Sequence, residues 1–291
     1  MPDPDPTTPC RLALPKGRMQ EGVLRLFADA RIPVRLGARD YRPSLALEGF
    51  EAKLLKPQNI VEMLDAGSRD LGFAGADWVA ELGAELVEVL DTGLDPVRIV
   101  AAAPAEVAAR LGEPGRTWRV ASEYAELTRE WLESRGLEAR LLRSFGATEA
   151  FPPEDADLVV DNTATGSTLA AQGLVVVEEL LSSSTRLYAN PRSLERPEVR
   201  ERVDALALLL RSVLDARQRV VLEVNVTEED LPGVCDALPA MREPTVANLH
   251  GRRGFAVKAA VLRDELPGLV PLLKARGATD LVVTAPAQIV P

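Results

Sequence analysis

The stretch ADLVVDNTATGSTLAAQGL, residues 156–174, changes character twice. An apolar run, Leu158–Val160, ends at Asp161, small and hydroxylated residues follow, and a short helical pattern begins after Gly166. A strand that passes through a tight turn into a helix is the repeating unit of α/β proteins, and ligands bind beyond the carboxyl ends of such strands. The stretch therefore predicts an α/β fold with a ligand site at this turn.

The residue types in the turn suit an anion. Successive backbone amides at a helix N-terminus, with hydroxyl groups beside them, favour bound phosphate. Small side chains leave the backbone accessible, and Gly166 permits dihedral angles that other residues resist. Because Asp161 would repel a phosphate, we expect it to accept hydrogen bonds from sugar hydroxyl groups. An ordinary capped turn without a ligand is the alternative. The candidate site comprises Asp161, Asn162, Thr163, Ala164, Thr165, Gly166, Ser167 and Thr168.

Composition disfavours several other classes of protein. The 291-residue chain has a formal net charge of −10, which argues against broad binding to nucleic acid or to an anionic membrane. The one histidine, His250, cannot by itself build a zinc site or sustain much acid–base chemistry. No lysine follows Gly166 as in a P-loop, and no G-x-G-x-x-G follows a predicted strand. Cys10 and Cys235 are expected to be reduced thiols, and residues 1–10 lack the features of a signal peptide. We therefore predict a cytoplasmic protein with a disordered leader over residues 1–10.

Strand-like and helical patterns alternate from Arg11 to a long predicted helix that ends near Arg217. This alternation predicts a largely parallel sheet with helices on both faces. The segment is longer than one compact sheet needs, so we expect two α/β lobes around a cleft, an architecture that resembles type II periplasmic binding proteins. Lobe I is expected to cover residues 11–95 with a return segment over about 185–217, and lobe II residues 96–184.

The remaining residues, 218–291, follow the order β-α-β-β-α-β and predict a ferredoxin-like domain. Its expected elements are VVLEVNV (220–226), a helix over 230–238, TVANL (245–249), GFAVKAAV (254–261), a helix over 264–275 and TDLVVTA (279–285).

Several stretches together resemble one enzyme family. An acid followed by TATGST (163–168) is similar to the loop that phosphoribosyltransferases wrap around the 5-phosphate of phosphoribosyl pyrophosphate. Further stretches resemble, in the family's order, ATP phosphoribosyltransferase of histidine biosynthesis, in its long form with a C-terminal regulatory domain. Lys56 stands where that family usually has arginine, and Glu123 where many members have lysine. The stretches are LALPKGRMQEGVLRLFADARI, KPQNIVEMLDAGSRDLGFAGADWV, VRIVAAAP, RVASEYAELTREWL, SSSTRLYAN, ALPAMREPTVANL and ARGATDLVVTAPAQIVP.

The resemblance implies a reaction in which N1 of the ATP adenine joins C1 of the phosphoribosyl group and pyrophosphate leaves with Mg²⁺. Lys16 and Arg18, just after the first predicted strand, are the candidate catalytic residues. The resemblance also implies histidine as a feedback inhibitor and a homo-oligomer that passes between dimer and hexamer. Asn225 and Thr245 are candidates for the histidine site, and the metal ligands stay unassigned. Possible further substrate contacts are Lys56, Asp70, Asp77 and Arg98.

Other interpretations stay open. A two-lobed solute-binding protein without catalysis would share the architecture, and the turn alone would also fit a phosphoribosyltransferase for another base. Asp77 could cap a helix and Arg98 could form a structural ion pair, while Lys16 and Arg18 could be solvated surface charges.

Overall fold

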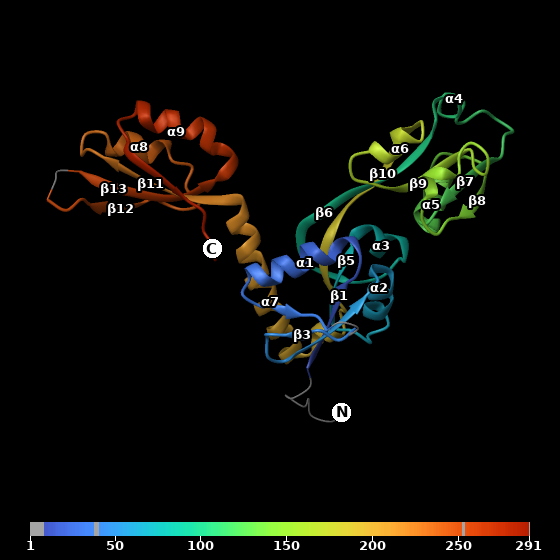
Figure 1. Ribbon diagram of the computed structural model, residues 1–291, viewed down its shortest axis with the longest axis horizontal. Coiled ribbons are helices and arrows are strands. Elements are labelled where there is room, and N and C mark those ends of the chain that lie inside the picture. The colour runs from blue at the N-terminus through green and yellow to red at the C-terminus, as the bar shows by residue number, and fades with distance from the viewer. Residues whose placement is uncertain (1–8, 38–40, 252–253, 291) are drawn as a thin grey trace. The chain divides into compact units, whose positions relative to one another are not determined.

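The computed structural model describes residues 9–37, 41–251 and 254–290. The chain forms two compact units (Figure 1): unit 1 contains Met1–Arg25 and Ile32–Asp204, and unit 2 contains Leu26–Arg31 and Ala205–Pro291. Each unit combines helices with a β-sheet, which confirms the predicted α/β class. Within the described residues, no helix combines the length and apolarity needed to cross a membrane.

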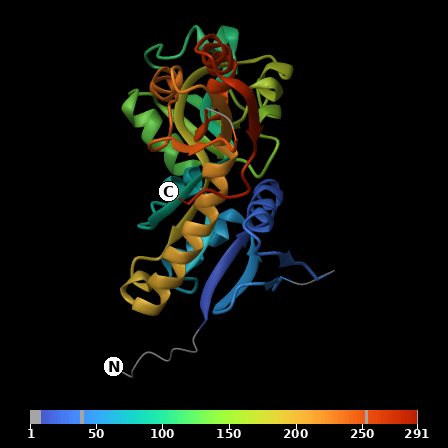
Figure 2. The same cartoon turned by 90° about the vertical axis from the view of Figure 1, so that its left-hand side faces the viewer.

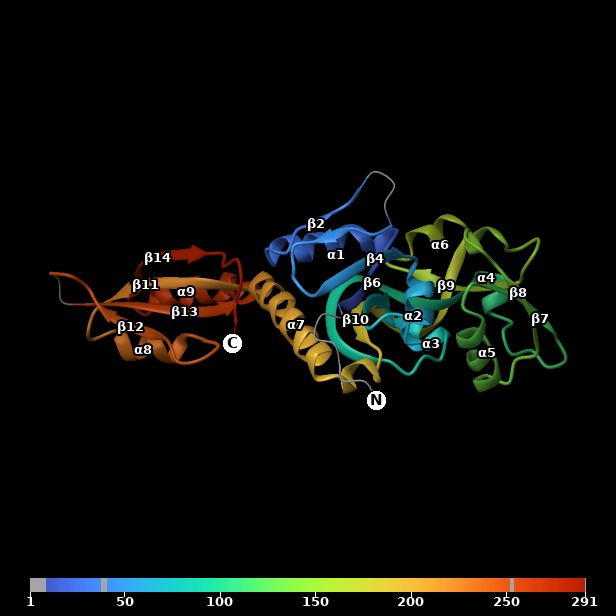
Figure 3. The same ribbon diagram turned by 90° about the horizontal axis from the view of Figure 1, so that it is seen from below.

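Unit 1 is built on one sheet with the strand order β4-β1-β5-β10-β6-β9-β7-β8. β1 lies parallel to β4 and β5, which form lobe I, and β7 lies parallel to β8 and β9, which form lobe II. The long strands β6 and β10 pair antiparallel and run through both lobes (Figures 1 and 3). The strands are β1 (Cys10–Pro15), β4 (Phe50–Leu55), β5 (Leu71–Gly75), β6 (Val87–Pro104), β7 (Trp118–Ser122), β8 (Ala139–Arg143), β9 (Leu158–Thr163) and β10 (Leu174–Ala189).

Short helices cover this sheet, and β1 and β4 can be followed side by side in Figure 2. A small two-stranded sheet of β2 (Val34–Arg35) and β3 (Ser44–Leu45) accompanies lobe I. The helices are α1 (Arg18–Asp29), whose last turn belongs to unit 2, α2 (Pro57–Asp65), α3 (Ala76–Glu81), α4 (Ala105–Ala108), α5 (Ala125–Ser134), α6 (Ser167–Ala171) and the 3₁₀ helices η1 (Thr148–Ala150) and η2 (Ser193–Glu195).

The sheet differs from the predicted, largely parallel one because β6 and β10 are antiparallel to all their neighbours. The apolar runs LVEVL (86–90) and VRIVAAAP (97–104) predict two separate strands where β6 is continuous, and the sequence pattern predicts no strand for β10. The segment DTGLDP (91–96) interrupts the apolar pattern, and Gly93 and Asp95 within it have φ angles of 63° and 49°, but the strand continues through them. The predicted lobe boundaries at residues 95/96 and 184/185 therefore fall inside these two strands. At the N-terminus, residues 1–8 of the expected leader lie outside the described residues, whereas Cys10 is buried in β1.

The antiparallel strands direct the carboxyl ends of the two lobes toward each other. β5 ends with Gly75 opposite Thr185 of β10. β9 runs the other way and ends with Thr163 opposite Arg98 of β6, which in turn pairs with Ser182 of β10. Ligands of α/β proteins bind beyond such strand ends, so the pairing places the expected substrate region near the middle of β6 and β10.

Each lobe has its own apolar packing. In lobe I, Ile60 and Leu64 of α2 pack on Ala13 and Ala74 of the sheet. This close approach requires Gly72 on β5, because a Cβ there would lie 2.7 Å from Cγ2 of Ile60. In lobe II, separate clusters cover the two faces of the sheet. One contains Trp118, Tyr124 and Trp131, and the other contains Val100, Val159 and Leu169.

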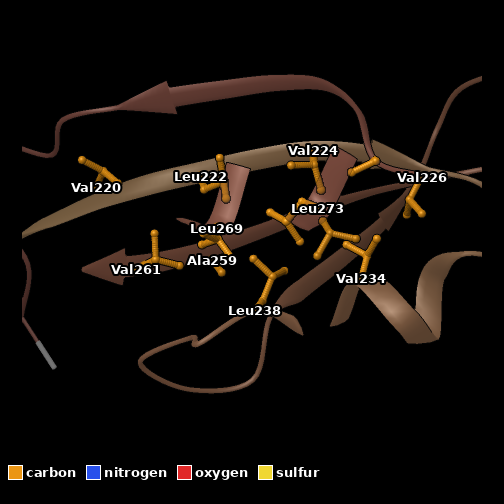
Figure 4. Packing of buried hydrophobic residues seen from close by; sticks show 12 residues of the cluster. Val220, Leu222, Val224, Val226, Val234, Leu238, Ala259, Val261, Leu269 and Leu273 are labelled. Carbon is orange, nitrogen blue, oxygen red and sulfur yellow. The ribbon is translucent and has the colours of Figure 1, made fainter. Parts of the chain in front are cut away.

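Unit 2 contains the predicted ferredoxin-like arrangement, with the sheet order β12-β13-β11-β14. Alternate residues of β11 point to one face, where they pack against Val234 of α8 and Leu273 of α9 (Figure 4). The elements are α7 (Pro197–Gln218), which begins in unit 1, β11 (Arg219–Val226), α8 (Leu231–Ala237), β12 (Thr245–Asn248), β13 (Phe255–Leu262), η3 (Arg263–Glu265), α9 (Leu266–Ala275) and β14 (Thr279–Thr284).

Candidate active site

The turn after β9 is closed by its own side chains. Oγ1 of Thr163, a residue only 8% exposed, accepts the backbone N–H of Gly166 at 2.8 Å. Gly166 has φ +80° and precedes the first residue of α6. The hydroxyl groups of Thr165 and Ser167 lie 2.9 Å apart, and the N–H groups of Thr165 and Thr168 have no acceptor among the described residues. The turn thus exposes both hydroxyls and unused amides, as an oxyanion requires.

Most residues of the turn line a cavity of about 360 Å³ at the end of β9. Gly166 shapes the turn without lining the cavity, and a Cβ built on it would meet no atom of the protein within 4 Å. Its requirement is therefore conformational, because the left-handed backbone strains any other residue. The lining residues are Glu149, Asp161, Asn162, Thr163, Ala164, Thr165, Ser167, Thr168 and Leu169.

The Asp161 carboxylate is held at an energetic cost. Burial, together with the negative charges of Glu123 and Glu149, raises its pKa from 3.8 to about 6, against the opposing effect of the hydrogen bond from the backbone N–H of Asn162. Among the described residues, no lysine, arginine or histidine side chain forms an ion pair with Asp161. A carboxylate in this state accepts hydrogen bonds from hydroxyl groups, or approaches a cation, more favourably than an already paired one.

A chain of hydrogen bonds connects the turn to lobe I. The side-chain amide of Asn162 donates to the hydroxyl of Tyr124 at 3.2 Å, and that hydroxyl donates to Asp77 at 2.8 Å. The other oxygen of Asp77 accepts from the Ser183 hydroxyl at 2.6 Å. Trp78 stacks on Tyr124 with ring centroids 4.8 Å apart. Asp77 is therefore linked to the turn, but it is only 2% exposed and both of its oxygens accept hydrogen bonds from the protein, which leaves no free oxygen for the predicted substrate contact. Its side chain makes no cap of its own helix, α3.

The predicted cations of lobe I gather at the carboxyl ends of neighbouring strands. Lys16 follows β1 and its backbone N–H donates to the carbonyl of Leu55, so Lys16 and Lys56 lie side by side. The ammonium of Lys16 lies 3.6 Å from the ring centroid of Tyr41. Arg18 begins α1, is exposed and has no ion-pair partner among the described residues.

Arg98 lies on β6 directly opposite Thr163 and forms an ion pair with Glu179 at 3.4 Å. Both partners of this ion pair are partly exposed, with 42% of the Arg98 side chain and 39% of the Glu179 side chain in contact with solvent. The structure thus shows the structural ion pair that the sequence left open, at a position beside the turn.

Asp70 lies elsewhere. It precedes β5 and therefore lies at the amino end of the strand, whereas Asp77 follows the carboxyl end. Asp70 is fully buried and accepts from Arg11 at 2.7 Å, Arg196 at 2.6 Å and the Ser193 hydroxyl at 2.7 Å. Burial would raise its pKa, but these hydrogen bonds outweigh burial and lower the pKa to about 2. Its position and contacts indicate a structural role in place of the predicted substrate contact.

Four residues near the site are absent from the sequence-based candidates: Tyr41, Tyr124, Glu149 and Ser183. Tyr124 and Ser183 lie within stretches that resemble the family, but no local pattern distinguishes their side chains. Their role arises from contacts between segments that are far apart in the chain, such as Asp77 and Ser183, which are 106 positions apart.

In unit 2, Asn225 and Thr245 line one cavity of about 430 Å³ on the sheet face opposite α8 and α9. The Asn225 amide donates to Asp280 at 3.0 Å, and Lys258 pairs with Glu223 beside it. The two predicted effector residues are therefore brought together by β11 and β12, in a cavity that offers charges of both signs.

The fold is that of a two-lobed α/β protein with an added ferredoxin-like unit, and the turn after β9 presents hydroxyls and free amides to a cavity. A family model for ATP phosphoribosyltransferase matches residues 56–212, and a model for the HisG C-terminal domain matches residues 216–285. The chain is 37% identical to an ATP phosphoribosyltransferase of Chlorobium phaeovibrioides, over 93% of this chain and 94% of that protein. It is 34% identical to one of Pelotomaculum thermopropionicum, over 97% and 99%.

A solved structure is also similar. The ATP phosphoribosyl transferase (HisG:HisZ) complex of Thermotoga maritima matches with a TM-score of 0.63 and 26% identity. The match covers 98% of that chain but only 70% of the present one. The chain belongs to the ATP phosphoribosyltransferase family.

Proposed function

We propose that this chain condenses ATP with phosphoribosyl pyrophosphate to give N1-(5-phosphoribosyl)-ATP and pyrophosphate, the first step of histidine biosynthesis. Family membership over nearly the whole chain supports the reaction. The observation that carries the site is the cavity at the end of β9, where hydroxyls and unused amides of one turn surround about 360 Å³. The 5-phosphate binds in this cavity, and Asp161 accepts hydrogen bonds from the ribose hydroxyls.

The chemistry demands alignment and charge stabilisation more than proton transfer. Positive charge develops on the sugar at C1 and negative charge on the departing pyrophosphate. The Asp161 carboxylate faces the sugar, while Lys16 and Arg18 from lobe I supply positive charge for the pyrophosphate or the ATP phosphates. Lys56 and Arg98 extend this positive potential from the ends of β4 and the middle of β6. Asp77 is only 2% exposed, so it acts indirectly and positions Asn162 through Tyr124.

Mg²⁺ fits the cavity as a companion of the substrate. Two carboxylates, Glu149 and Asp161, line it, and Mg²⁺ in proteins commonly keeps several waters and binds through one or two carboxylates plus substrate phosphates. These two residues would hold the metal, which would neutralise charge on the pyrophosphate. A nearby cation would offset the burial and the charges of Glu123 and Glu149 that raise the pKa of Asp161.

Gly166→Val tests the phosphate site, and Gly173→Val is its matched control. Both glycines have positive φ, 80° and 71°, and neither has an atom within 4 Å of a built Cβ. The backbone strain is therefore comparable, but only Gly166 belongs to the turn. We expect Gly166→Val to abolish binding of phosphoribosyl pyrophosphate in calorimetry, with an unchanged circular dichroism spectrum, while Gly173→Val binds normally. If both variants bind phosphoribosyl pyrophosphate equally well, the phosphate does not bind at this turn.

Arg18→Ala tests the positive charge of lobe I. Removal of a contact that stabilises transition-state charge lowers turnover by on the order of tens to hundreds of fold. Arg25→Ala on the same helix removes an equal, exposed charge and serves as the control. The assay is release of pyrophosphate with ATP and with free bases as acceptors, which also separates this reaction from transfer to another base and from binding without catalysis. A change below about twofold for Arg18→Ala would make it a surface charge.

Histidine as the feedback inhibitor is proposed to bind unit 2 at the cavity that contains Asn225 and Thr245. A chain that ends at Gln218 is expected to retain activity and lose inhibition by histidine. Inhibition that persists in the shortened chain would place the effector elsewhere.

We further propose that the protein is a homo-oligomer in the cytoplasm. Light scattering with and without histidine measures its assembly. The Thermotoga structure contains a second protein, HisZ, in its complex, whereas the present chain carries the added C-terminal unit itself.

A further inference from the structure

A second cavity, of about 340 Å³, lies within unit 2 and is separate from the cavity that contains Asn225 and Thr245. The end of α1, the last part of α7 and the segment that follows β14 surround it. Arg31, Arg217 and Arg263 all line this cavity, each from a different element. We propose that the cavity, here called the arginine pocket, binds a phosphate group.

The charges of the arginine pocket are unbalanced. Asp29 is the one carboxylate in its lining, and it pairs with Arg217 at 2.8 Å. The Nε of Arg263 donates to the neutral backbone carbonyl of Arg217 at 3.4 Å, and Arg263 forms no ion pair with any residue that the structure describes. Arg31 has no ion-pair partner among the described residues. Two positive charges therefore remain in excess at one cavity of a chain whose net charge is −10.

Guanidinium groups are suited to phosphate in particular. Each has five donors in a planar fork that can bond two phosphate oxygens at once. Guanidinium groups from separate elements can bond different oxygens of one phosphate. The volume lies at the lower end of the range of small-molecule sites, about 300 to 1,000 Å³, so a phosphate with a modest organic group is the expected class of ligand.

The backbone at Arg31 supports a requirement for its side chain. Arg31 has φ +63°, and its N–H bonds to the carbonyl of Ala28 as the chain leaves α1. Glycine, or sometimes asparagine, usually occupies this left-handed position after a helix, because other residues are strained there. A long cationic side chain therefore occupies a position where glycine would be less strained.

The opposite wall of the arginine pocket is fixed by packing. Val213 and Ala216 of α7 are each 2% exposed and contribute to the lining. The chain after β14 is attached to α7 by a hydrogen bond of 2.9 Å from the N–H of Ile289 to the carbonyl of Ser212, and Pro286 and Ala287 line the pocket from that segment. The arginines therefore surround a cavity whose apolar wall is already ordered.

Calorimetric titration of the full chain tests the arginine pocket, with inorganic phosphate in one arm and uridine monophosphate in the other. Gly166→Val serves as the background, so that the turn after β9 does not contribute to binding. We expect one equivalent of phosphate to bind in this background, more weakly as salt increases. The double variant Arg31→Gly/Arg263→Ala should weaken binding at least tenfold, since each lost charge-assisted bond contributes about a factor of ten. Arg25→Ala/Arg242→Ala, which removes two exposed charges elsewhere, should leave the affinity unchanged.

Binding of uridine monophosphate that is tighter than binding of inorganic phosphate would assign an organic phosphate as the ligand, and equal affinities would assign the free anion. Arg31→Gly alone should also raise the melting temperature in the absence of phosphate, because it removes backbone strain. An arginine needed only for folding would show the opposite change. The proposal is overturned by the absence of phosphate binding in the Gly166→Val background, or by equal affinity in the double variant.

Discussion

Asp161→Asn should make the protein more stable at neutral pH while weakening its proposed contact with the sugar, because a neutral amide oxygen is a poorer acceptor than a carboxylate. Burial and the charges of Glu123 and Glu149 raise the pKa of Asp161 from 3.8 to about 6 in the folded protein. The unfolded chain releases the proton near the ordinary value, so the folded state binds more protons between about pH 4 and pH 6. Stability therefore falls as the pH rises through that range, and the full penalty persists above it.

The magnitude follows from the size of this shift. A rise of about 2 pH units at about 1.4 kcal/mol per unit gives a penalty of about 3 kcal/mol at pH 8. Asparagine has nearly the same shape, and its carbonyl oxygen can still accept the backbone N–H of Asn162, which lies 2.7 Å from Oδ1 of Asp161. The amide has no charge to bury. The variant should therefore be more stable than the wild type by up to about 3 kcal/mol above pH 6, with little difference near pH 4.

Urea unfolding at pH 4 and pH 8 measures the two free energies of unfolding. Asp155→Asn, at an exposed position with no ion pair among the described residues, is the control for removal of a negative charge from the same loop region. A difference between Asp161→Asn and wild type that is equal at the two pH values would contradict the reasoning. So would a variant that is less stable at pH 8.

Three further substitutions examine other parts of the fold. Asp70→Asn should lower the free energy of unfolding by about 2 kcal/mol at pH 7, because the pKa of Asp70 is lowered to about 2 in the folded protein. In urea unfolding this difference should shrink as the pH falls below about 4, and a difference that stays constant would exclude the ion pairs as its cause. Gly72→Ala should lower the free energy of unfolding by about 1–3 kcal/mol, because its Cβ would lie 2.7 Å from Ile60 and 3.0 Å from Ala13, and an unchanged value would show that α2 can shift away. Leu273→Ala removes a fully buried side chain from the core of unit 2 and should cost about 2–5 kcal/mol there, seen as faster hydrogen exchange in β11 to β14, while uniform exchange across both units would show that they unfold together.

The features that could be predicted from sequence are those with local causes. The turn around Gly166 was predictable because an apolar strand, a helix start and a positive φ each favour particular residue types at neighbouring positions. The order of elements in unit 2 was predictable for the same reason, since β11 alternates buried and half-buried residues along its whole length. Most predicted helices agree with the structure to within a residue or two, as for α7, which ends at Gln218.

The rest depends on partners far away in the chain. Ser183, Ser184 and Thr185 look too polar for a central strand, but their hydroxyls bond Asp77, Asp91 and Asp95, so β10 continues through them. Such contacts leave no periodic pattern in either segment.

Asp70 and Asp77 illustrate the same difficulty at the site. They flank one short strand and look alike in the sequence, yet the direction of β5 relative to its neighbours places only Asp77 near the turn.

The path of β10 also determines the order in which unit 1 can be completed during synthesis. β5 acquires its second neighbour from Thr185–Ala189, which the ribosome adds after all the strands of lobe II. Domains generally fold as they emerge, at about 5–20 residues per second. Lobe II can thus complete its sheet from a nearly contiguous segment, whereas in lobe I one edge of β5 stays unpaired until β10 has been synthesised. That edge is the part of the newborn chain that a chaperone would need to shield first.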